Sequence, residues 1–198
     1  MNIQEMDILN FLSQESFTNQ RDLSECTGFS LGIVNRSLKA LEAQGHLDGD
    51  KRLTASARAQ LRETQPQRAV ILAAGIGMRM VPINMETPKG LIRVRGEVLI
   101  ERLIRQLHAA GVREIAVVVG FMKEQFEYLI DDFGVELVVN ENYAGSNNLH
   151  SLRLVQDRLR NAYILPCDIY CAQNPFRPQE LYSWYMVKDT ESQPASLR

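Results

Sequence analysis

Hydrophobic and polar positions divide the chain into two parts with different periodicities. In residues 1–63, apolar side chains such as Ile3, Met6 and Leu9 recur at helical spacing. From Arg68 onward, short runs of apolar residues alternate with amphipathic segments. The first pattern predicts a small helical domain. The second predicts an α/β domain, in which a mostly parallel sheet is covered by helices on both faces.

The helical part predicts three helices, a small hairpin and a last helix. The expected N-caps are Asn19 or Thr18 for the second helix, Ser30 for the third and Thr54 or Ser56 for the last. Asp48-Gly49 predicts the hairpin turn. This order resembles a winged helix-turn-helix domain. The resemblance implies that the helix at 30–44 enters the DNA major groove. The candidate DNA-contacting residues are then Asn35, Arg36, Ser37 and Lys39 on the helix, and Lys51 and Arg52 on the wing.

The charge of this domain leaves a second interpretation open. Its first 65 residues contain more acidic than basic side chains, whereas a duplex-binding domain usually presents a basic surface. We therefore consider DNA binding and a protein-interaction or dimerisation role as equal alternatives. The second alternative predicts a homodimer.

The second part predicts a domain over residues 68–198, joined to the first by a polar linker at 64–67. The expected strands are 68–74, 114–120, 135–140 and 162–168, and the expected helices are 98–111, 123–134 and 147–161. Ligands of such sheets bind beyond the carboxyl ends of the strands. Those ends are Ala74-Gly75, Gly120, Asn140 and Asp168.

The stretch "VILAAGIGMRMVPINMETPKGLIRV", residues 70–94, carries the most specific chemistry. Gly75 and Gly77 allow the backbone to approach an anion closely, and Arg79 offers a planar fork to phosphate oxygens. Lys89, held behind a proline, is suited to neutralise charge that develops on phosphorus. The spacing is that of neither a Walker A loop nor the dinucleotide-binding fingerprint.

This stretch resembles the signature of Rossmann-like nucleotidyltransferases, which join a nucleoside triphosphate to a phosphorylated small molecule and release pyrophosphate. The pattern of Asn140, Tyr143, Asn147, Asn148, Ser151 and Leu152 resembles the bacterial CTP:phosphocholine cytidylyltransferases. The resemblance implies transfer of CMP from CTP to phosphocholine or a similar acceptor. A sugar-1-phosphate nucleotidylyltransferase, or a DNA-binding regulator that senses a nucleotide or metabolite, is the alternative.

The resemblance also implies roles for individual residues. Arg79 and Lys89 are the expected catalytic residues, and Asp168 is the expected ligand of a Mg²⁺ cofactor. The nucleotide-binding residues are expected to be Leu72, Ala73, Ala74, Gly75, Gly77, Gly120, Phe121, Asn140, Asn147 and Asn148. Tyr143, Tyr170, Trp184 and Tyr185 are either an aromatic cage for a quaternary ammonium or ordinary core and interface residues.

Composition excludes several other classes of protein. The net charge of −2 gives no general attraction to nucleic acid or anionic membranes, and the apolar runs are too short to span a bilayer. The N-terminus lacks a secretory signal, and the three cysteines form no disulfide pattern, so we expect a cytoplasmic protein. The family domain normally continues past the position of Trp184 to a second acidic metal ligand. We therefore expect this sequence to be a fragment or a shortened protein.

Overall fold

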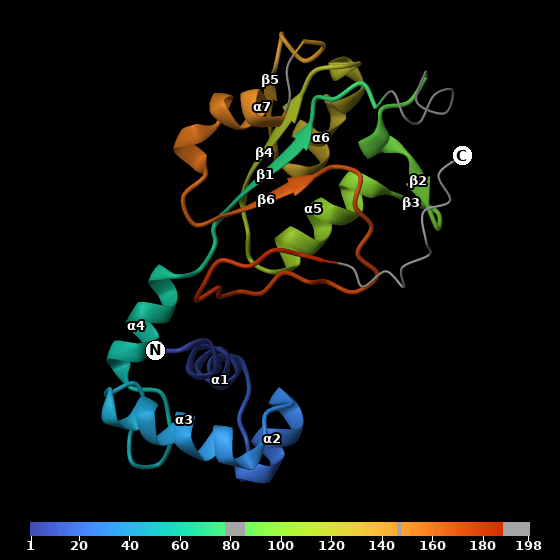
Figure 1. Cartoon of the computed structure of the whole chain (residues 1–198). Helices are drawn as coiled ribbons and strands as arrows, with labels where there is room; N and C mark the ends of the chain where they lie inside the picture. The colour runs from blue at the N-terminus through green and yellow to red at the C-terminus, as the bar shows by residue number, and fades with distance from the viewer. Residues whose placement is uncertain (78–85, 146–147, 188–198) are drawn as a thin grey trace, which may run out of the picture. The chain divides into compact units, whose positions relative to one another are not determined.

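A computed structural model describes residues 1–77, 86–145 and 148–187 (Figure 1). The chain forms two compact units. The first contains Met1–Leu61 together with the segment that begins at Glu180, and the second contains Arg62–Gln179. Among the described helices, none has the length and apolarity that a membrane crossing requires.

The first unit is built from helices whose apolar faces meet in one core. Its helices are α1 (Ile3–Gln14), α2 (Gln20–Thr27), α3 (Leu31–Ala43) and α4 (Ala55–Glu63). The buried cluster contains Ile8, Leu9, Leu23, Val34, Leu38, Leu41, Leu47 and Leu61. Leu47 and Leu53 form a single antiparallel bridge, which closes the expected hairpin between α3 and α4.

The helix starts agree with the cap residues. Asn19 Oδ1 accepts hydrogen bonds from the backbone N–H groups of Arg21 and Asp22, and Ser30 Oγ accepts one from Ile33. Thr54, one of two alternatives, accepts from Ala57. These bonds satisfy donors that a helix end leaves without a partner.

The wing turn differs from the prediction. It runs from Asp48 to Lys51, whose N–H donates to Asp48 O at 3.0 Å. The positive φ of this turn falls on Lys51, at 62°, and not on Gly49. Asp48 Oδ1 accepts from the N–H groups of Asp50 and Arg52, so a side-chain cap sets the turn in place of glycine freedom.

The second unit contains the predicted parallel sheet, in the order β5-β4-β1-β6. Its strands are β1 (Arg68–Ala73), β4 (Glu114–Val119), β5 (Glu136–Val139) and β6 (Ala162–Pro166). All four expected strands are confirmed within one or two residues. The strand that follows β1 along the sheet, β4, pairs with one edge of β1, whereas β6 pairs with the opposite edge. The strand order therefore reverses between β1 and β6, which is where open α/β sheets bind ligands.

Helices cover both faces of this sheet, as Figure 1 shows. The larger core joins α5 (Leu99–Ala109) and α6 (Tyr128–Phe133) to one face, where Ala69, Ile71 and Ala73 of β1 point. Val70 and Leu72 point to the other face and pack near α7 (Asn148–Leu154). This alternation follows from the two-residue period of a strand.

Two predicted helices are interrupted, and one element was not predicted. Residues 123–134 form a 3-10 turn, Lys123–Phe126, before α6, and the described part of 147–161 forms α7 followed by a 3-10 turn, Gln156–Arg158. A short antiparallel hairpin of β2 (Arg93–Val94) and β3 (Glu97–Val98) precedes α5. Its turn has positive φ at Arg95 and Gly96, a conformation that two-residue hairpin loops require.

The described residues after Gln179, 180–187, belong to the first unit, although the sequence placed residues 68–198 in one domain. Leu181 packs against the helical core, and the Tyr182 hydroxyl donates to Asp7 Oδ1 at 2.7 Å. The segment has neither helical nor strand periodicity, so local pattern gave no indication of which unit it would contact.

Candidate active site

The predicted site residues gather at the carboxyl ends of the parallel strands. Ala74 and Gly75 follow β1, Gly120 follows β4, Asn140 follows β5 and Asp168 follows β6. Parallel pairing places these ends along one edge of the sheet. The described residues of the predicted site therefore lie along the edge of the sheet at which α/β proteins bind ligands.

Lys89 and Asp168 meet at this edge. Lys89 Nζ lies 3.4 Å from Asp168 Oδ2, and the two side chains are 18% and 40% exposed. Lys89 opens a 3-10 turn, Lys89–Leu91, behind the buried Pro88. Asp168 follows Cys167, whose N–H donates to Leu72 O at 3.1 Å and extends the β1–β6 pairing. A cation and a carboxylate are thus held together at the solvent boundary.

Gly90 fixes the approach of the lysine segment. A Cβ atom at Gly90 would lie 3.0 Å from Cys167 Cβ and 3.3 Å from its Sγ. Gly90 and Cys167 are both buried. Since only glycine permits this contact without displacement, Gly90 sets how closely Lys89 approaches β6. Burial, with a smaller effect from the Asp168 charge, raises the pKa of the Cys167 thiol to about 12.

The turn after β1 offers open backbone. Ala73 and Ala74 are buried and Leu72 is half-buried against the core on the α7 side. Gly75 is exposed, with nothing within 4 Å of where its Cβ would stand, and Gly77 has a φ of 72°. Arg79 lies outside the described residues.

Gly120 allows the loops after β1, β4 and β5 to pack together. A Cβ there would lie 2.6 Å from Tyr143 Cβ and 2.9 Å from Ala74 O. The Phe121 N–H donates to Ala74 O at 3.2 Å, and the Phe121 and Tyr143 rings are 6.4 Å apart. Tyr143 therefore occupies the space beside the buried Gly120. Of the two predicted nucleotide-binding residues Gly120 and Phe121, only Phe121 is partly exposed.

The asparagines differ in their surroundings. Asn140 is 1% exposed; its Nδ2 donates to Ser151 Oγ at 3.1 Å, and its Oδ1 accepts from Asn142 N–H at 3.0 Å. Its amide thus joins the end of β5 to α7 and shapes the following turn. Asn148 is exposed at the start of α7, while Asn147 lies outside the described residues.

Two of the four aromatic residues named above, Tyr143 and Tyr170, have partners within the second unit. Tyr143 fills the space at Gly120, and the Tyr170 ring lies beneath two guanidinium groups, of Arg102 at 5.0 Å and of Arg95 at 5.6 Å. Trp184 and Tyr185 belong to the first unit. Within the second unit, both tyrosines therefore contact protein groups, and the aromatic cage stays a prediction.

The described acidic residues fit a metal only in part. Within residues 1–77, 86–145 and 148–187, no group of three or more His, Cys, Asp or Glu side chains is arranged to hold a metal ion. Asp168 supplies one exposed carboxylate. A single carboxylate fits Mg²⁺ that arrives on a nucleotide, because this ion is usually held by one or two carboxylates plus substrate phosphates.

The first unit presents a second candidate surface. Asn35, Arg36 and Lys39 are exposed on α3, whereas Ser37 is 2% exposed and points into the core, so its predicted place on the outer face is wrong. The reason is the helical period, which returns Ser37 to the face of Val34 and Leu38.

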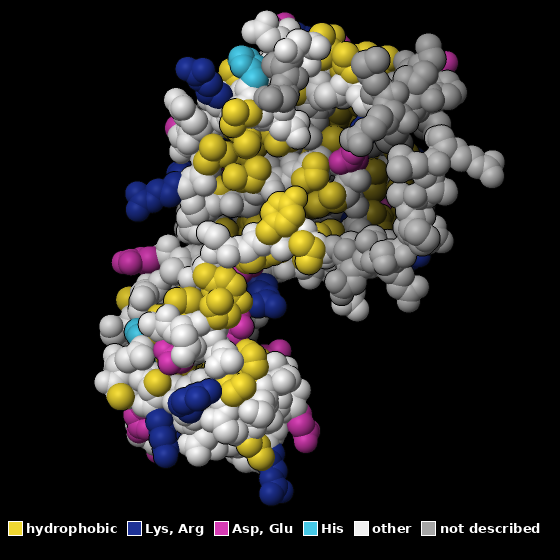
Figure 2. Space-filling view, in the orientation of Figure 1, with side chains coloured by type: hydrophobic (Ala, Val, Ile, Leu, Met, Phe, Trp, Pro, Cys, Tyr) yellow, Lys and Arg dark blue, Asp and Glu magenta, His cyan; other side chains and the backbone are white. Residues whose placement is uncertain are grey.

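The wing residues also differ from each other. Arg52 is exposed, but Lys51 forms an ion pair with Glu42. An open groove, lined by Asn19, Gln20, Arg21, Leu31, Gly32 and Asn35, adds residues of α2 that the sequence reasoning missed. Over the face shown in Figure 2, Lys and Arg side chains are interspersed with Asp and Glu side chains on this unit.

Other residues of the second unit were also missed. Gln125 Nε2 donates to Glu86 O at 3.1 Å and so connects the loop after β4 to the segment before Lys89. Arg102 contacts the segment after Asp168. A glutamine or arginine in a helical segment carries no sequence signal that would have predicted these contacts.

Comparisons with known proteins found relatives of the second unit. The choline-phosphate cytidylyltransferase of Streptococcus pneumoniae is 44% identical over 118 residues, which cover 60% of this chain and 52% of that protein. The 2-aminoethylphosphonate cytidylyltransferase of Lancefieldella rimae is 40% identical over 121 residues, 59% of this chain and 49% of that protein. The chain spans about half the length of the curated relatives it matches.

A solved structure and two family models complete the comparison. The structure of the CTP:phosphocholine cytidylyltransferase from Streptococcus pneumoniae superposes with a TM-score of 0.55 at 45% identity, over 56% of this chain and 49% of that one. Residues 1–45 match the winged helix-turn-helix DNA-binding model. Residues 69–179, more than half of the chain, match the MobA-like NTP transferase domain. The protein therefore belongs to the MobA-like NTP transferase family and carries an N-terminal winged helix-turn-helix domain.

Proposed function

We propose that the second unit transfers CMP from CTP to phosphocholine, or to a closely similar amino-alcohol phosphate or aminoalkylphosphonate, and releases pyrophosphate. The observation that carries the proposal is the Lys89–Asp168 pair at the β1/β6 crevice. The similarity to choline-phosphate and 2-aminoethylphosphonate cytidylyltransferases supports the choice of nucleotide and of acceptor class.

The reaction needs charge neutralisation more than proton transfer. An acceptor phosphate is already an anion and attacks the α-phosphorus of CTP, while the bond to the bridging oxygen of pyrophosphate breaks. Lys89, only 18% exposed, stabilises the negative charge that builds up on the α-phosphate oxygens. The open backbone at Gly75 and Gly77 binds the triphosphate, and Arg79 contacts its oxygens.

Magnesium is part of the proposal. When bound with the nucleotide, Mg²⁺ would offset phosphate charge. Asp168 is the described carboxylate that would hold it. Asp168 and Lys89 lie side by side, so one would hold the ion and the other would contact the phosphate.

The experiment is a pyrophosphate-release assay with the full chain, CTP and Mg²⁺. Phosphocholine, 2-aminoethylphosphonate and glucose 1-phosphate serve as parallel acceptors, and Lys89→Met serves as the inactive control. Release with phosphocholine or with 2-aminoethylphosphonate supports the proposal. Release only with glucose 1-phosphate shows that the acceptor class is wrong, and no CTP binding by calorimetry rejects the function.

A second function is favoured by the N-terminal unit. Its match to winged helix-turn-helix DNA-binding domains, the exposed Asn35, Arg36 and Lys39, and the α2–α3 groove support a DNA-binding regulator whose transferase domain senses a nucleotide. A mobility-shift assay with DNA from upstream of the protein's own reading frame, with and without CTP, tests this role. The absence of any shift at low salt rejects it.

A further inference from the structure

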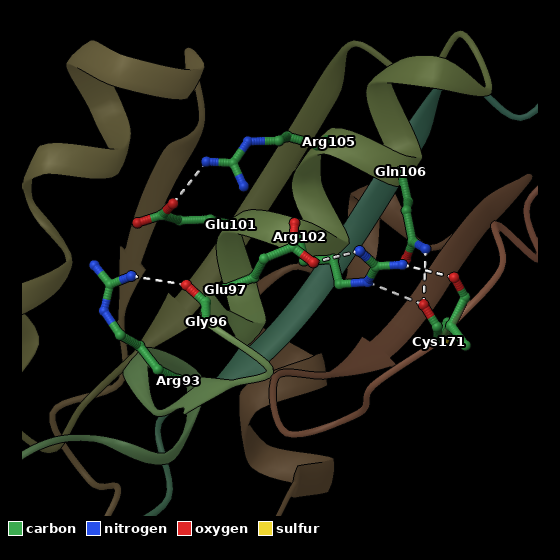
Figure 3. Close-up of polar contacts among 9 residues, drawn as sticks. Arg93, Gly96, Glu97, Glu101, Arg102, Arg105, Gln106 and Cys171 are labelled. Carbon is green, nitrogen blue, oxygen red and sulfur yellow. Dashed lines mark hydrogen bonds and ion pairs between the residues drawn. The ribbon is translucent and has the colours of Figure 1, made fainter.

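The segment that carries Asp168 has no regular secondary structure to hold it. After β6, residues 167–179 contain neither helix nor strand. Side chains of α5 supply the missing hydrogen bonds. Arg102 Nε donates to Cys171 O at 3.0 Å and Arg102 Nη2 donates to Ala172 O at 2.7 Å, while Gln106 Nε2 donates to the same Cys171 oxygen at 2.9 Å (Figure 3).

Arg102 also contacts the side of the site that carries Lys89. Its Nη1 lies 2.5 Å from Glu97 Oε2, in the hairpin that follows the lysine turn. This hairpin is tied to the turn because Leu99 N–H donates to Ile92 O at 3.1 Å. One guanidinium group thus bridges the two segments that bring Lys89 and Asp168 together, although its partners lie 5, 69 and 70 residues away in sequence.

The planar face of the Arg102 guanidinium also contacts a neighbour, the Tyr170 ring. The Arg102 guanidinium carbon lies 5.0 Å from the centre of the Tyr170 ring, two residues after Asp168. A planar guanidinium presents donors along its edge and attracts an aromatic ring with its face, so Arg102 engages four residues at once. Lysine has the charge but not this geometry.

We propose that Arg102 is a positioning residue, which sets the separation of Lys89 and Asp168 by clamping residues 170–172 to α5 and to the β2–β3 hairpin. The expected effect of Arg102 on turnover rests on the proposed cytidylyl transfer. The contacts of Arg102 with residues 170–172 and with Glu97 do not depend on that function. A displacement of about 1 Å at a reacting group lowers a rate by up to about a hundredfold, so loss of the clamp affects turnover without any direct contact with substrate.

Arg105 offers a matched control on the same helix. It forms an ion pair with Glu101 at 2.7 Å, and its guanidinium lies 5.3 Å from the Phe133 ring. Both of these contacts lead to α5 and α6, away from residues 170–172. Arg105→Gln removes the same charge and shape as Arg102→Gln but should leave the clamp intact.

The chain contains its own probes of the clamp. Cys171 is half-buried within the clamped segment, Cys167 is buried just before it, and Cys26 is exposed in the other unit. Alkylation of each thiol in the full-length protein, followed by peptide mass spectrometry, gives the rate at Cys171 relative to Cys26. Arg102→Gln should raise this ratio on the order of tenfold, the effect of losing a charge-assisted hydrogen bond on an opening equilibrium. Arg105→Gln should leave it unchanged.

The kinetic arm uses the same variants with CTP, Mg²⁺ and phosphocholine. Arg102→Gln should lower kcat about 10- to 100-fold, raise the Mg²⁺ concentration needed for half-maximal rate, and leave the KM for CTP within about twofold. Arg102→Lys keeps the charge and is the second variant if the glutamine variant does not fold. It should recover only part of the Cys171 protection.

The outcomes separate this inference from the proposed function. If Cys171 is equally protected in wild type, Arg102→Gln and Arg102→Lys, the clamp does not exist and the inference is overturned. If Arg105→Gln shifts the Mg²⁺ requirement as much as Arg102→Gln does, Arg102 has no special positioning role. A wild type that binds no CTP rejects the proposed function, and the alkylation ratios then still decide on the clamp.

Discussion

Lys89 Nζ lies 3.4 Å from Asp168 Oδ2, although 79 positions separate the two residues in the sequence. Each follows one of two neighbouring strands, and these strands pair from Arg68↔Ala162 to Leu72↔Pro166. The pair therefore lies where the strand order reverses, and it places a cation and a carboxylate together at this edge of the sheet.

The first prediction concerns the charge of Lys89. Lys89→Met should lower kcat for CMP transfer by about 10²- to 10³-fold, because one preorganised group that stabilises transition-state charge is lost. The melting temperature should change little, since partly exposed ion pairs contribute little to stability. Arg68→Met, which breaks the Arg68–Glu114 pair at the opposite end of β1, is the control and should retain activity. Equal loss in both variants would contradict a specific role for Lys89.

Gly90 provides a prediction on stability. Gly90→Ala places a Cβ atom 3.0 Å from Cys167 Cβ, and it should lower the free energy of unfolding by about 1–3 kcal/mol, as overpacking does. Because the displaced segment begins with Lys89, kcat should fall too. Gly145→Ala adds a Cβ with nothing within 4 Å and should be neutral in urea unfolding. A neutral Gly90→Ala would show that the segment moves freely.

The thiol of Cys167 makes stability depend on pH. Its pKa is raised from 9.0 to about 12, so the unfolded chain loses this proton at lower pH than the folded protein does. The folded state then binds more protons between these values, and stability is complete below pH 9 and falls as the pH rises toward 12. At pH 10 this group should reduce the free energy of unfolding by about 1.4 kcal/mol.

Urea titrations at pH 8 and pH 10 measure this effect. Cys167→Ala removes the titrating thiol, so its unfolding free energy should fall less over that interval than the wild-type value does. Parallel loss in the two proteins would mean that the thiol titrates at its ordinary pKa when folded.

Helix α3 and the wing supply a prediction for DNA binding. Arg36→Gln and Lys39→Gln remove exposed charges from α3, and each should weaken duplex binding and reduce its salt dependence. Lys51→Gln should have a smaller effect, because Glu42 already pairs with this lysine. Fluorescence anisotropy over a range of salt concentrations compares the three variants. A larger effect of Lys51→Gln would show that its pair with Glu42 opens on DNA.

Local sequence patterns were sufficient to predict most of the helices and strands. Apolar runs of strand length predicted β1, β4, β5 and β6, and Asn19, Ser30 and Thr54 were among the expected caps. These features depend on interactions within a few residues, which the sequence shows directly. The breaks in the helices at 123–134 and 147–161 depend on packing against the sheet and were not predicted.

The candidate site divides along the same line. Gly75, Gly77, Lys89 and Asp168 were recognisable by residue type and by their position after a strand. The functions of Gly90, Gly120 and Asn140 within the fold were not, because each depends on a neighbour far away in sequence: Cys167, Tyr143 and Ser151. The contacts of Arg102 could not be predicted for the same reason, because Cys171 and Ala172 are also far away in sequence.

By itself, the sequence determined the two kinds of structure in this protein, the strand ends that carry its chemistry and the family to which its second unit belongs. Only the tertiary structure decided that β6 lies beside β1, that Lys89 therefore meets Asp168, and that the segment from Glu180 joins the helical unit. The physical reason is range: element type follows from local periodicity, whereas strand order and loop contacts follow from which distant surfaces bury one another best.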